Sequence, residues 1–266
     1  MPDFNTITPA QLARVVGTPD APALIDVRLP EDVVEDPHLV PGSRLYPFDR
    51  PESLAATLTG RRAVILCQRG RKLSQGVAAH LRLKGIPAEV LEGGTIAWAE
   101  AGLPRVPLDS FSPGGLWVTR HRPKIDRIAC PWLIRRFVDP AARFLYVAPA
   151  EVLGVAERFA ATPFDVPDVR WSHRGECCTF DTMVEEFGLS TPALERLATV
   201  VRAADNDRHD LAPQAAGLLA VSVGLSRLYR DDLEQLEAGM GLYDALYRWA
   251  RDGFDEGHDW PAGRPA

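Results

Sequence analysis

The chain has 266 residues, 46% hydrophobic and 25% charged, so it can bury a full core and by its length suggests two domains. Its formal net charge of −6 argues against broad electrostatic binding to nucleic acid or anionic lipid, because those surfaces favour a basic protein face. No apolar run approaches the roughly 20 residues of a membrane-spanning helix and the N-terminus lacks a signal-peptide pattern, so we expect a cytoplasmic protein that neither binds a membrane nor takes nucleic acid as a partner.

Residues 1–106 alternate short apolar segments with segments of helical spacing. Thr8 and Gln11 flank Pro9 in the pattern of a capping box at the start of a helix. Three apolar runs are typical of buried strands: ALIDV at 23–27, AVILC at 63–67 and AEVLE at 88–92. Because these strands alternate with helices, we predict an α/β domain in which helices flank a parallel sheet.

Cys67 ends the second of these runs and precedes a segment of helical spacing. We therefore expect it at the carboxyl end of a strand, where open α/β sheets bind their ligands. Gly70 allows a turn that leaves successive backbone N–H groups free to face the thiol. Three cations lie in the same loop: Arg69, Arg71 and Lys72. With the dipole of the following helix, these groups would stabilise a thiolate, an oxyanion or a persulfide, and the alternative is a buried cysteine with a structural role.

Residues 107–116 are rich in Pro, Gly and Ser and lack periodicity, so we expect a linker. Residues 117–255 are predicted to form a second, mainly helical α+β domain, and residues 256–266 a frayed tail. Helices are indicated in four places: from Cys130 or Pro131, from Thr191 and Pro192, along 213–229 and along 233–247. Two segments could instead be strands: RFLYVA at 143–148 and CCTFDTMV at 177–184.

Nitrogen and oxygen donors of the kind that bind zinc, manganese or iron occur in two segments of the second domain. They are His173, Glu176, Asp205, Asp207 and His209, and Asp126 could join them. Their spacing suggests a divalent-metal site in this half of the chain. The alternative is a solvated, helix-capping stretch at 205–210 and a histidine that packs at the surface.

A basic segment precedes the helix expected at Pro131: Arg120, His121, Arg122, Lys124 and Arg127. Basic side chains near a helix N-terminus can hold an oxyanion, and ordinary surface charge with ion pairs is the alternative. Cys177 and Cys178 could receive sulfur from Cys67 or act as reductants. A free cysteine in an apolar strand also behaves as a small core residue, so both interpretations stay open.

Four ordered motifs in residues 1–106 resemble a single rhodanese domain: LIDVR at 24–28, HLVPGS at 38–43, the cysteine loop, and VLEGGTIAWAEAGLP at 90–104. The resemblance implies a sulfurtransferase that needs no cofactor and carries persulfide on Cys67. It implies a substrate cradle at Gln68, Arg69, Gly70, Arg71 and Lys72. Thiosulfate or another sulfane-sulfur donor and a thiol acceptor would be its partners.

Two further residues match the rhodanese pattern, and two residues of the cysteine loop depart from it. Asp26 and Arg28 match a motif at the strand end, where they would brace the loop by hydrogen bonds. Lys72 stands where the family pattern CxxGxRS has arginine, and Leu73 stands where it has serine. Lysine keeps the charge but lacks the planar fork of arginine, so we expect a looser grip on an oxyanion. Leucine at position 73 disfavours the phosphatase chemistry of the related C-x5-R loop.

Three motifs of the second half resemble the C-terminal domain of the ChrB family of chromate-resistance proteins over residues 117–252. They are RHRPKIDRIACPWLIRRFVDPAARF at 120–144, WSHRGECCTFDTMVEEFGL at 171–189 and VRAADNDRHDLAPQAAGL at 201–218. The resemblance implies chromate or another oxyanion as a partner. ChrB regulators are thought to carry an additional N-terminal DNA-binding region, and a rhodanese-like domain occupies that end here, so promoter binding is not expected.

These observations favour a cytoplasmic rhodanese-type sulfurtransferase, with persulfide on Cys67, fused to a chromate-resistance-like domain. The alternative is a sensor of oxyanions, chromate or redox state. In that case the C-terminal domain would bind a metal, and Cys67 would react or bind a ligand without sulfur-transfer turnover.

Overall fold

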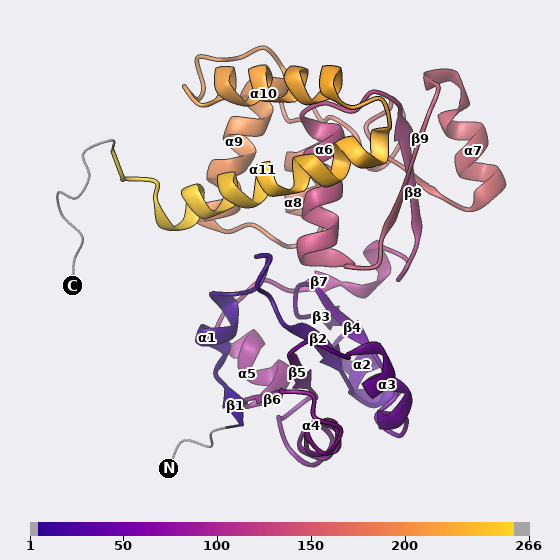
Figure 1. Ribbon diagram of the computed structural model, residues 1–266, viewed down its shortest axis with the longest axis vertical. Coiled ribbons are helices and arrows are strands. Elements are labelled where there is room, and N and C mark those ends of the chain that lie inside the picture. The colour runs from indigo at the N-terminus through magenta and orange to yellow at the C-terminus, as the bar shows by residue number, and fades with distance from the viewer. Residues whose placement is uncertain (1–4, 258–266) are drawn as a thin grey trace.

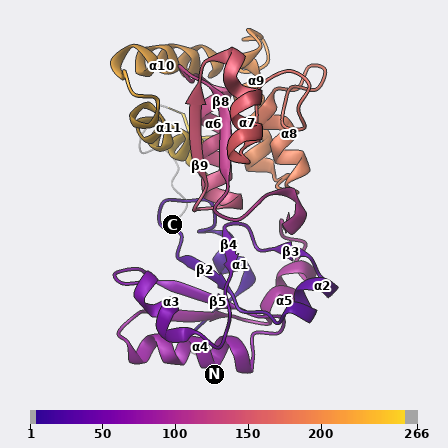
Figure 2. The same cartoon turned by 90° about the vertical axis from the view of Figure 1, so that its right-hand side faces the viewer.

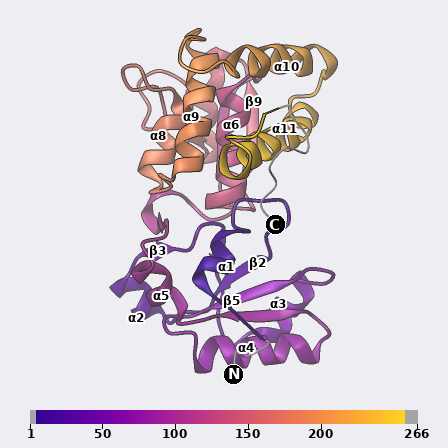
Figure 3. The same ribbon diagram turned by 90° about the vertical axis from the view of Figure 1, so that its left-hand side faces the viewer.

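The computed structural model describes residues 5–257 as two lobes, one above the other in Figure 1. The N-terminal lobe (residues 5–107) contains a five-stranded sheet, and the C-terminal lobe (residues 116–257) contains most of the long helices. Figures 2 and 3 show the same division from two other sides. This architecture confirms the predicted fold class of a parallel α/β sheet followed by a mainly helical α+β part.

The sheet of the N-terminal lobe is parallel throughout, as the alternation of strands and helices predicts. In spatial order its strands are β1 (Thr6–Ile7), β6 (Ala88–Leu91), β5 (Ala63–Leu66), β2 (Ala23–Asp26) and β4 (Ser43–Leu45). The three apolar runs predicted as strands form β2, β5 and β6. Because β5 is the central strand, the residue that follows it, Cys67, lies in the middle of the carboxyl edge of the sheet.

Helices cover both faces of this sheet. They are α1 (Pro9–Ala13), α2 (Pro30–Glu35), α3 (Pro51–Thr57), α4 (Lys72–Leu83) and α5 (Gly94–Glu100). Side chains alternate between the two faces of each strand. In β5, Val64 and Leu66 belong to the same core as α1 and α5, whereas Ala63 and Ile65 belong to the core under α3 and α4.

The C-terminal lobe combines a small parallel sheet with a helical bundle (Figure 2). Its sheet has the order β10 (Thr162–Pro163), β8 (Leu116–Arg120) and β9 (Arg143–Val147). Its α-helices are α6 (Asp126–Leu133), α7 (Val152–Phe159), α8 (Thr179–Glu186), α9 (Pro192–Asp205), α10 (Ala215–Leu228) and α11 (Asp232–Asp252). Short turns of helix lie at η1 (Leu108–Ser110), η2 (Ile134–Val138) and η3 (Pro149–Glu151). Among residues 5–257, no helix is long and apolar enough to span a membrane.

Most local predictions for individual elements are confirmed. Thr8 and Gln11 exchange the two hydrogen bonds of a capping box at the start of α1. Thr191 caps α9 ahead of a proline, and the segment RFLYV forms strand β9. The prediction of a strand at 177–184 is wrong, because these residues start helix α8. The backbone N–H of Cys178 donates to Asp181 Oδ2, a helix-starting hydrogen bond that outweighs the apolar strand-like pattern.

Helix α6 also differs from expectation, because it begins at Asp126 rather than at Cys130 or Pro131. Pro131 therefore lies inside the helix, where its missing N–H leaves the Arg127 carbonyl without its usual helical donor. The Tyr146 hydroxyl donates to that carbonyl at 3.0 Å. A side chain from β9 thus replaces the hydrogen bond that proline removes.

The segment between the lobes is partly ordered by the N-terminal lobe. Strand β7 (Val106–Pro107) pairs antiparallel with β3 (His38–Leu39), and η1 follows it. The predicted linker at 107–116 thus starts within β7. The domain boundaries at 106, 116 and 255 stay predictions, and residues 258–266 of the predicted tail lie outside the described residues.

One apolar core continues through both lobes, from Leu12 and Trp98 in the N-terminal lobe to Trp132 and Phe137 in the C-terminal lobe. The π-helical turn η2 makes the contact. The carbonyl of Phe137 accepts a hydrogen bond of 2.6 Å from the backbone N–H of Gly42. An ideal Cβ on Gly17 would lie 2.0 Å from the Phe137 ring, so this contact requires glycine.

This contact predicts a specific stability effect. Gly17→Ala and Gly60→Ala introduce the same methyl at positive φ, +77° and +74°, but only Gly17 faces an occupied site. We expect Gly17→Ala to lower the free energy of unfolding by about 1–3 kcal/mol more than Gly60→Ala does, because it overpacks the site against Phe137. Urea unfolding of the full chain measures both. Equal losses for the two variants would contradict the lobe contact.

Candidate functional site

The first candidate site is the loop between β5 and α4. Cys67 begins this loop and is 5% exposed, so its thiol is almost fully covered. The Cys67 carbonyl accepts a hydrogen bond of 3.0 Å from the N–H of Thr95, and the Gln68 carbonyl accepts one of 3.1 Å from the N–H of Ile96. Both donors lie in the first turn of α5. The N-terminus of α5 therefore clamps the loop by its carbonyl groups.

The backbone N–H groups of the same loop are left unpaired. Among the hydrogen bonds of residues 5–257, none uses the N–H of any residue from Gln68 to Lys72 as a donor. Successive unpaired N–H groups form a concave anion site, or nest. Among the described residues these five N–H groups are therefore available as donors to an anion bound at the loop.

Two glycines make this loop geometry attainable. Gly70 has φ +63°, and a Cβ there would lie 2.4 Å from the Leu91 carbonyl oxygen. Gly94 has φ +66°, and a Cβ there would lie 2.2 Å from the Cys67 carbonyl oxygen. Any L side chain at either position would push the loop away from α5.

The cations of the loop are free of partners. In the described part of the chain, Arg69, Arg71 and Lys72 are exposed and make no ion pair or side-chain hydrogen bond. Gln68 instead donates through Nε2 to Glu35 Oε2 at 2.9 Å. Three of the predicted cradle residues thus offer positive charge to an incoming anion.

Ser74 is a residue that the sequence interpretation missed. It is fully buried, and its hydroxyl lies 3.1 Å from Cys67 Sγ and 3.1 Å from the Arg71 carbonyl oxygen. The family pattern has serine at position 73, which is leucine in this chain. The hydroxyl that contacts Cys67 belongs to Ser74, one residue further along the chain, in the first turn of α4.

Asp26 and Arg28 brace the neighbouring strand end. Arg28 Nε donates to Asp26 Oδ2 at 2.8 Å, and the rest of its guanidinium donates to the carbonyls of Asp36 and His38. Burial raises the pKa of Asp26, against the opposing attraction of Arg28. This buried pair ties β2 to the segment after α2, in agreement with the bracing role proposed for it.

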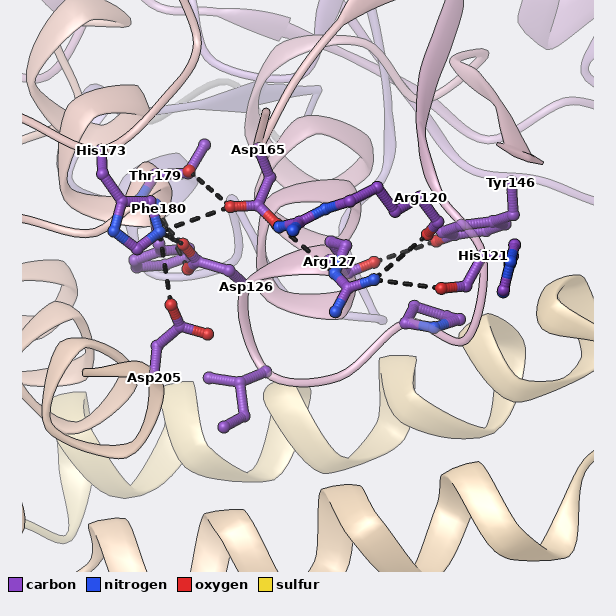
Figure 4. Close-up of polar contacts among 12 residues, drawn as sticks. Arg120, His121, Asp126, Arg127, Tyr146, Asp165, His173, Thr179, Phe180 and Asp205 are labelled. Atoms are coloured by element: carbon purple, nitrogen blue, oxygen red, sulfur yellow. Dashed lines mark hydrogen bonds and ion pairs between the residues drawn. The ribbon is translucent and has the colours of Figure 1, made fainter. Parts of the chain in front are cut away.

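A second cluster, of three carboxylates and one imidazole, lies in the C-terminal lobe (Figure 4). His173 Nε2 lies 3.4 Å from Asp126 Oδ2, 3.4 Å from Asp165 Oδ1 and 3.3 Å from Asp205 Oδ2. Asp126 opens α6 and Asp205 ends α9, whereas Asp165 and His173 come from the segment between β10 and α8. Three carboxylates from separate points of the chain thus converge on one ring nitrogen.

The backbone of α8 and two arginines hold these carboxylates. Asp126 is completely buried and accepts hydrogen bonds from the N–H groups of Thr179 and Phe180, at 2.7 and 3.3 Å. Asp165 Oδ1 accepts from the Thr179 hydroxyl at 3.0 Å. Its other oxygen faces two cations: Arg120 at 2.9 Å and Arg127 at 3.4 Å.

The electrostatics of the cluster follow from burial and proximity. Burial raises the pKa of Asp126 to about 6. Hydrogen bonds to Asp126, Asp165 and Asp205 raise the pKa of His173 to about 12. Burial acts to raise the pKa of Asp165, but its hydrogen bonds to His173 and Arg120 outweigh burial and hold that pKa below its usual value. Protonated His173 thus contacts all three carboxylates, whereas Arg120 and Arg127 contact Asp165.

The structure brings together two of the five residues predicted to bind metal. His173 and Asp205 meet Asp126, whereas Glu176 is exposed on a turn and Asp207 is 94% exposed. His209 lies beside Asp207, with 3.8 Å between Nε2 and Oδ1. Asp165 was not predicted, because no spacing in the sequence links it to His173 or to Asp205.

The remaining candidates divide between core and surface. Cys130 and Cys178 are fully buried, and burial raises the pKa of both thiols well above the usual value, as expected for core residues. Cys177 is half-buried. Arg120 and Arg127 of the predicted oxyanion segment pair with Asp165, and Arg122 donates to the Ser226 carbonyl. His121 and Lys124 are exposed.

Comparison with known proteins identifies the C-terminal lobe. A family model described as the C-terminal domain of ChrB matches residues 117–250, half of the chain. The chain belongs to the ChrB C-terminal domain family. Protein ChrB of Cupriavidus metallidurans is 36% identical over 141 residues, which are 50% of this chain and 40% of that protein. An uncharacterized protein of Synechocystis sp. is 36% identical over 106 residues, which are 38% of this chain and 55% of that protein. The chain thus spans only about half the length of these relatives.

Solved structures similar to the part that precedes the ChrB C-terminal domain are rhodanese-like. A rhodanese-related protein from Thermoplasma volcanium is 23% identical, with 39% of this chain and 98% of that chain covered and a TM-score of 0.34. A thiosulfate sulfurtransferase from Pseudomonas aeruginosa is 27% identical, with 41% of this chain and 21% of that chain covered and a TM-score of 0.36.

The loop geometry makes the reactivity of Cys67 depend on Gly70. Gly70→Ala should slow alkylation of Cys67 by iodoacetamide by at least about tenfold, because displacing the loop removes donors worth about 1.5–3 kcal/mol to a thiolate. Gly85→Ala is the matched control, since Gly85 has φ +76° and no atom within 4 Å of its ideal Cβ. Peptide mass spectrometry separates Cys67 from Cys177. Unchanged alkylation in a folded Gly70→Ala variant would contradict a role for the loop donors.

Proposed function

We propose that this protein is a sulfurtransferase that carries sulfur as a persulfide on Cys67. The observation that carries the proposal is the run of five unpaired backbone N–H groups directly after a nearly buried thiol. Such donors stabilise a negative charge on sulfur without any metal. The rhodanese-like sequence motifs of residues 1–106 support the same activity.

In the first step the Cys67 thiolate attacks the sulfane sulfur of a donor such as thiosulfate. A sulfur–sulfur bond forms at Cys67, the donor's own sulfur–sulfur bond breaks, and sulfite leaves with the electron pair of that bond. The outer sulfur of the new persulfide keeps one negative charge. In this proposal the loop N–H groups stabilise the outer sulfur, whereas the Ser74 hydroxyl, 3.1 Å from Sγ, contacts the inner sulfur.

In the second step the thiolate of an acceptor attacks the outer sulfur. The acceptor becomes a persulfide, and the bonding pair returns to Cys67 as a thiolate, so the cycle closes without net oxidation or reduction. Arg69, Arg71 and Lys72 would attract anionic donors and acceptors, because they are exposed and unpaired within the described residues. Lys72 is a single point charge, so its grip on thiosulfate would be weaker than that of arginine.

For the ChrB C-terminal domain, we propose the handling of a small oxyanion, with chromate as the first candidate because of the family's link to chromate resistance. Its basic residues Arg120 and Arg127 already face Asp165, so an oxyanion would compete with that carboxylate. A sensor without turnover is the second candidate for the whole chain. The two candidates differ in whether Cys67 passes its bound sulfur to an acceptor repeatedly, as a sulfurtransferase would, or not, as a sensor would. Either function is expected to operate in the cytoplasm.

The activity test uses the full chain with thiosulfate and cyanide as acceptor. We expect thiocyanate to form catalytically, and the mass of the thiosulfate-treated protein to rise by one sulfur atom. Cys67→Ser should abolish both readouts, whereas Cys177→Ser should keep them. A single sulfur transfer without turnover would favour the sensor, and normal turnover by Cys67→Ser would contradict the proposal.

Lys72 gives a test of the cradle. Lys72→Ala should lower kcat/KM for thiosulfate roughly tenfold, because it removes one charge-assisted contact to the donor. Lys72→Arg should retain or improve that kcat/KM, because arginine adds a second donor. Steady-state kinetics measure both variants. Equal kinetics for Lys72→Ala and the parent would exclude Lys72 from the substrate site.

A further inference from the structure

We infer that Asp126, His173 and Asp205 form a binding site for one divalent transition-metal ion, with Asp165 as the carboxylate that completes their surroundings. This site goes beyond the proposed sulfur transfer, because it does not involve Cys67. It also differs from the set that the sequence suggested, since Glu176, Asp207 and His209 lie outside it.

The distances around His173 match those between the ligands of a metal ion. One N–H can donate a linear hydrogen bond to only one acceptor, and charge-assisted bonds of this kind measure about 2.7–2.9 Å. Nε2 instead lies 3.3–3.4 Å from three carboxylate oxygens. Two ligand atoms on a tetrahedral ion, each about 2.0–2.1 Å from it, lie about 3.3–3.4 Å apart. Asp126, His173 and Asp205 place one ligand atom each within 4.8 Å of one another.

The ion pairs of the cluster differ among its three carboxylates, and two of them favour a divalent cation. Asp165 contacts two cationic side chains, Arg120 and Arg127. Asp126 and Asp205 have no lysine or arginine partner among the described ion pairs, and Asp126 is completely buried. In the ion pairs of residues 5–257, His173 is the one cationic side chain that contacts both Asp126 and Asp205, so it supplies at most one positive charge for the two carboxylates. A divalent ion bound by neutral His173 would balance both carboxylates.

Supporting contacts hold the ligand Asp126 and the neighbouring carboxylate of Asp165 in place. The N–H groups at the start of α8 hold Asp126. Asp165 is fixed by Thr179 and the arginines. A carboxylate oxygen has two lone pairs, so Asp126 Oδ2 can accept from Thr179 and still bind a cation. This arrangement resembles the outer shell that orients metal ligands in known sites.

The donor set narrows the choice of ion. One imidazole nitrogen with carboxylate oxygens suits zinc, manganese or iron, whereas calcium and magnesium prefer oxygen donors alone. Thiolates would favour softer ions, and the buried thiols of Cys130 and Cys178 are not part of the cluster. His173 is 39% exposed, so solvent reaches one side of the site and can supply water as a further ligand.

The test measures metal binding to the full chain, purified without a polyhistidine tag and stripped of metal by a chelator that is then removed. Zn²⁺, Mn²⁺ and Fe²⁺ are added separately, and bound metal is measured by elemental analysis after gel filtration and by titration calorimetry. We expect one ion per chain for at least one of them. His173→Ala and Asp205→Asn should each weaken binding at least about tenfold.

The control is a variant with Glu176→Ala, Asp207→Ala and His209→Ala, which should bind the ion as the parent does. Of the three ligands, Asp205 is the one whose replacement is least expected to disturb folding, because it lies at the end of α9 and is 20% exposed. Circular dichroism checks that each variant folds. Failure of the parent to bind any of the three ions would overturn the inference. So would undiminished binding by folded His173→Ala and Asp205→Asn. Cys67→Ser should bind metal normally, so this result stands apart from the outcome of the sulfur-transfer assay.

Discussion

The hydrogen bonds from the first turn of α5 to the Cys67 loop are the constraint on which the N-terminal lobe depends. They hold the carbonyls of Cys67 and Gln68 on one side of the loop and leave the N–H groups of residues 68–72 unpaired. Gly70 and Gly94 make the close approach possible, because neither position has room for a Cβ. A buried thiol thereby acquires a polar surrounding made of backbone, which needs no charged side chain in the core.

The same principle recurs in the C-terminal lobe. Asp126 accepts hydrogen bonds from the N–H groups at the start of α8, so a helix N-terminus again positions a buried group. At the Cys67 loop the N–H groups of α5 donate to backbone carbonyls of the loop. At α8 the N–H groups donate to the side-chain carboxylate of Asp126. The two sites lie in different lobes, which meet through one continuous apolar core around Phe137.

Local patterns in the sequence predicted much of the N-terminal lobe. Buried strands, the capping box at Thr8 and the position of Cys67 all follow from short-range periodicity and from turn residues. The carboxylate cluster could not be predicted in this way, because Asp126 and Asp205 meet through the packing of α6, α8 and α9, and Asp165 reaches them from the segment between β10 and α8. The strand wrongly predicted at 177–184 shows the same limit. Its apolar residues fit a strand as well as a helix, and the contact of Asp181 with the Cys178 N–H decides between them.

A crystal structure of the full chain after treatment with thiosulfate tests the central claim most directly, since it shows both the bound sulfur and the donors around it. The account predicts one additional sulfur atom bonded to Cys67 Sγ, with the backbone N–H groups of residues 68–72 directed at it. An unmodified Cys67, or a persulfide whose outer sulfur points away from those N–H groups, would contradict it.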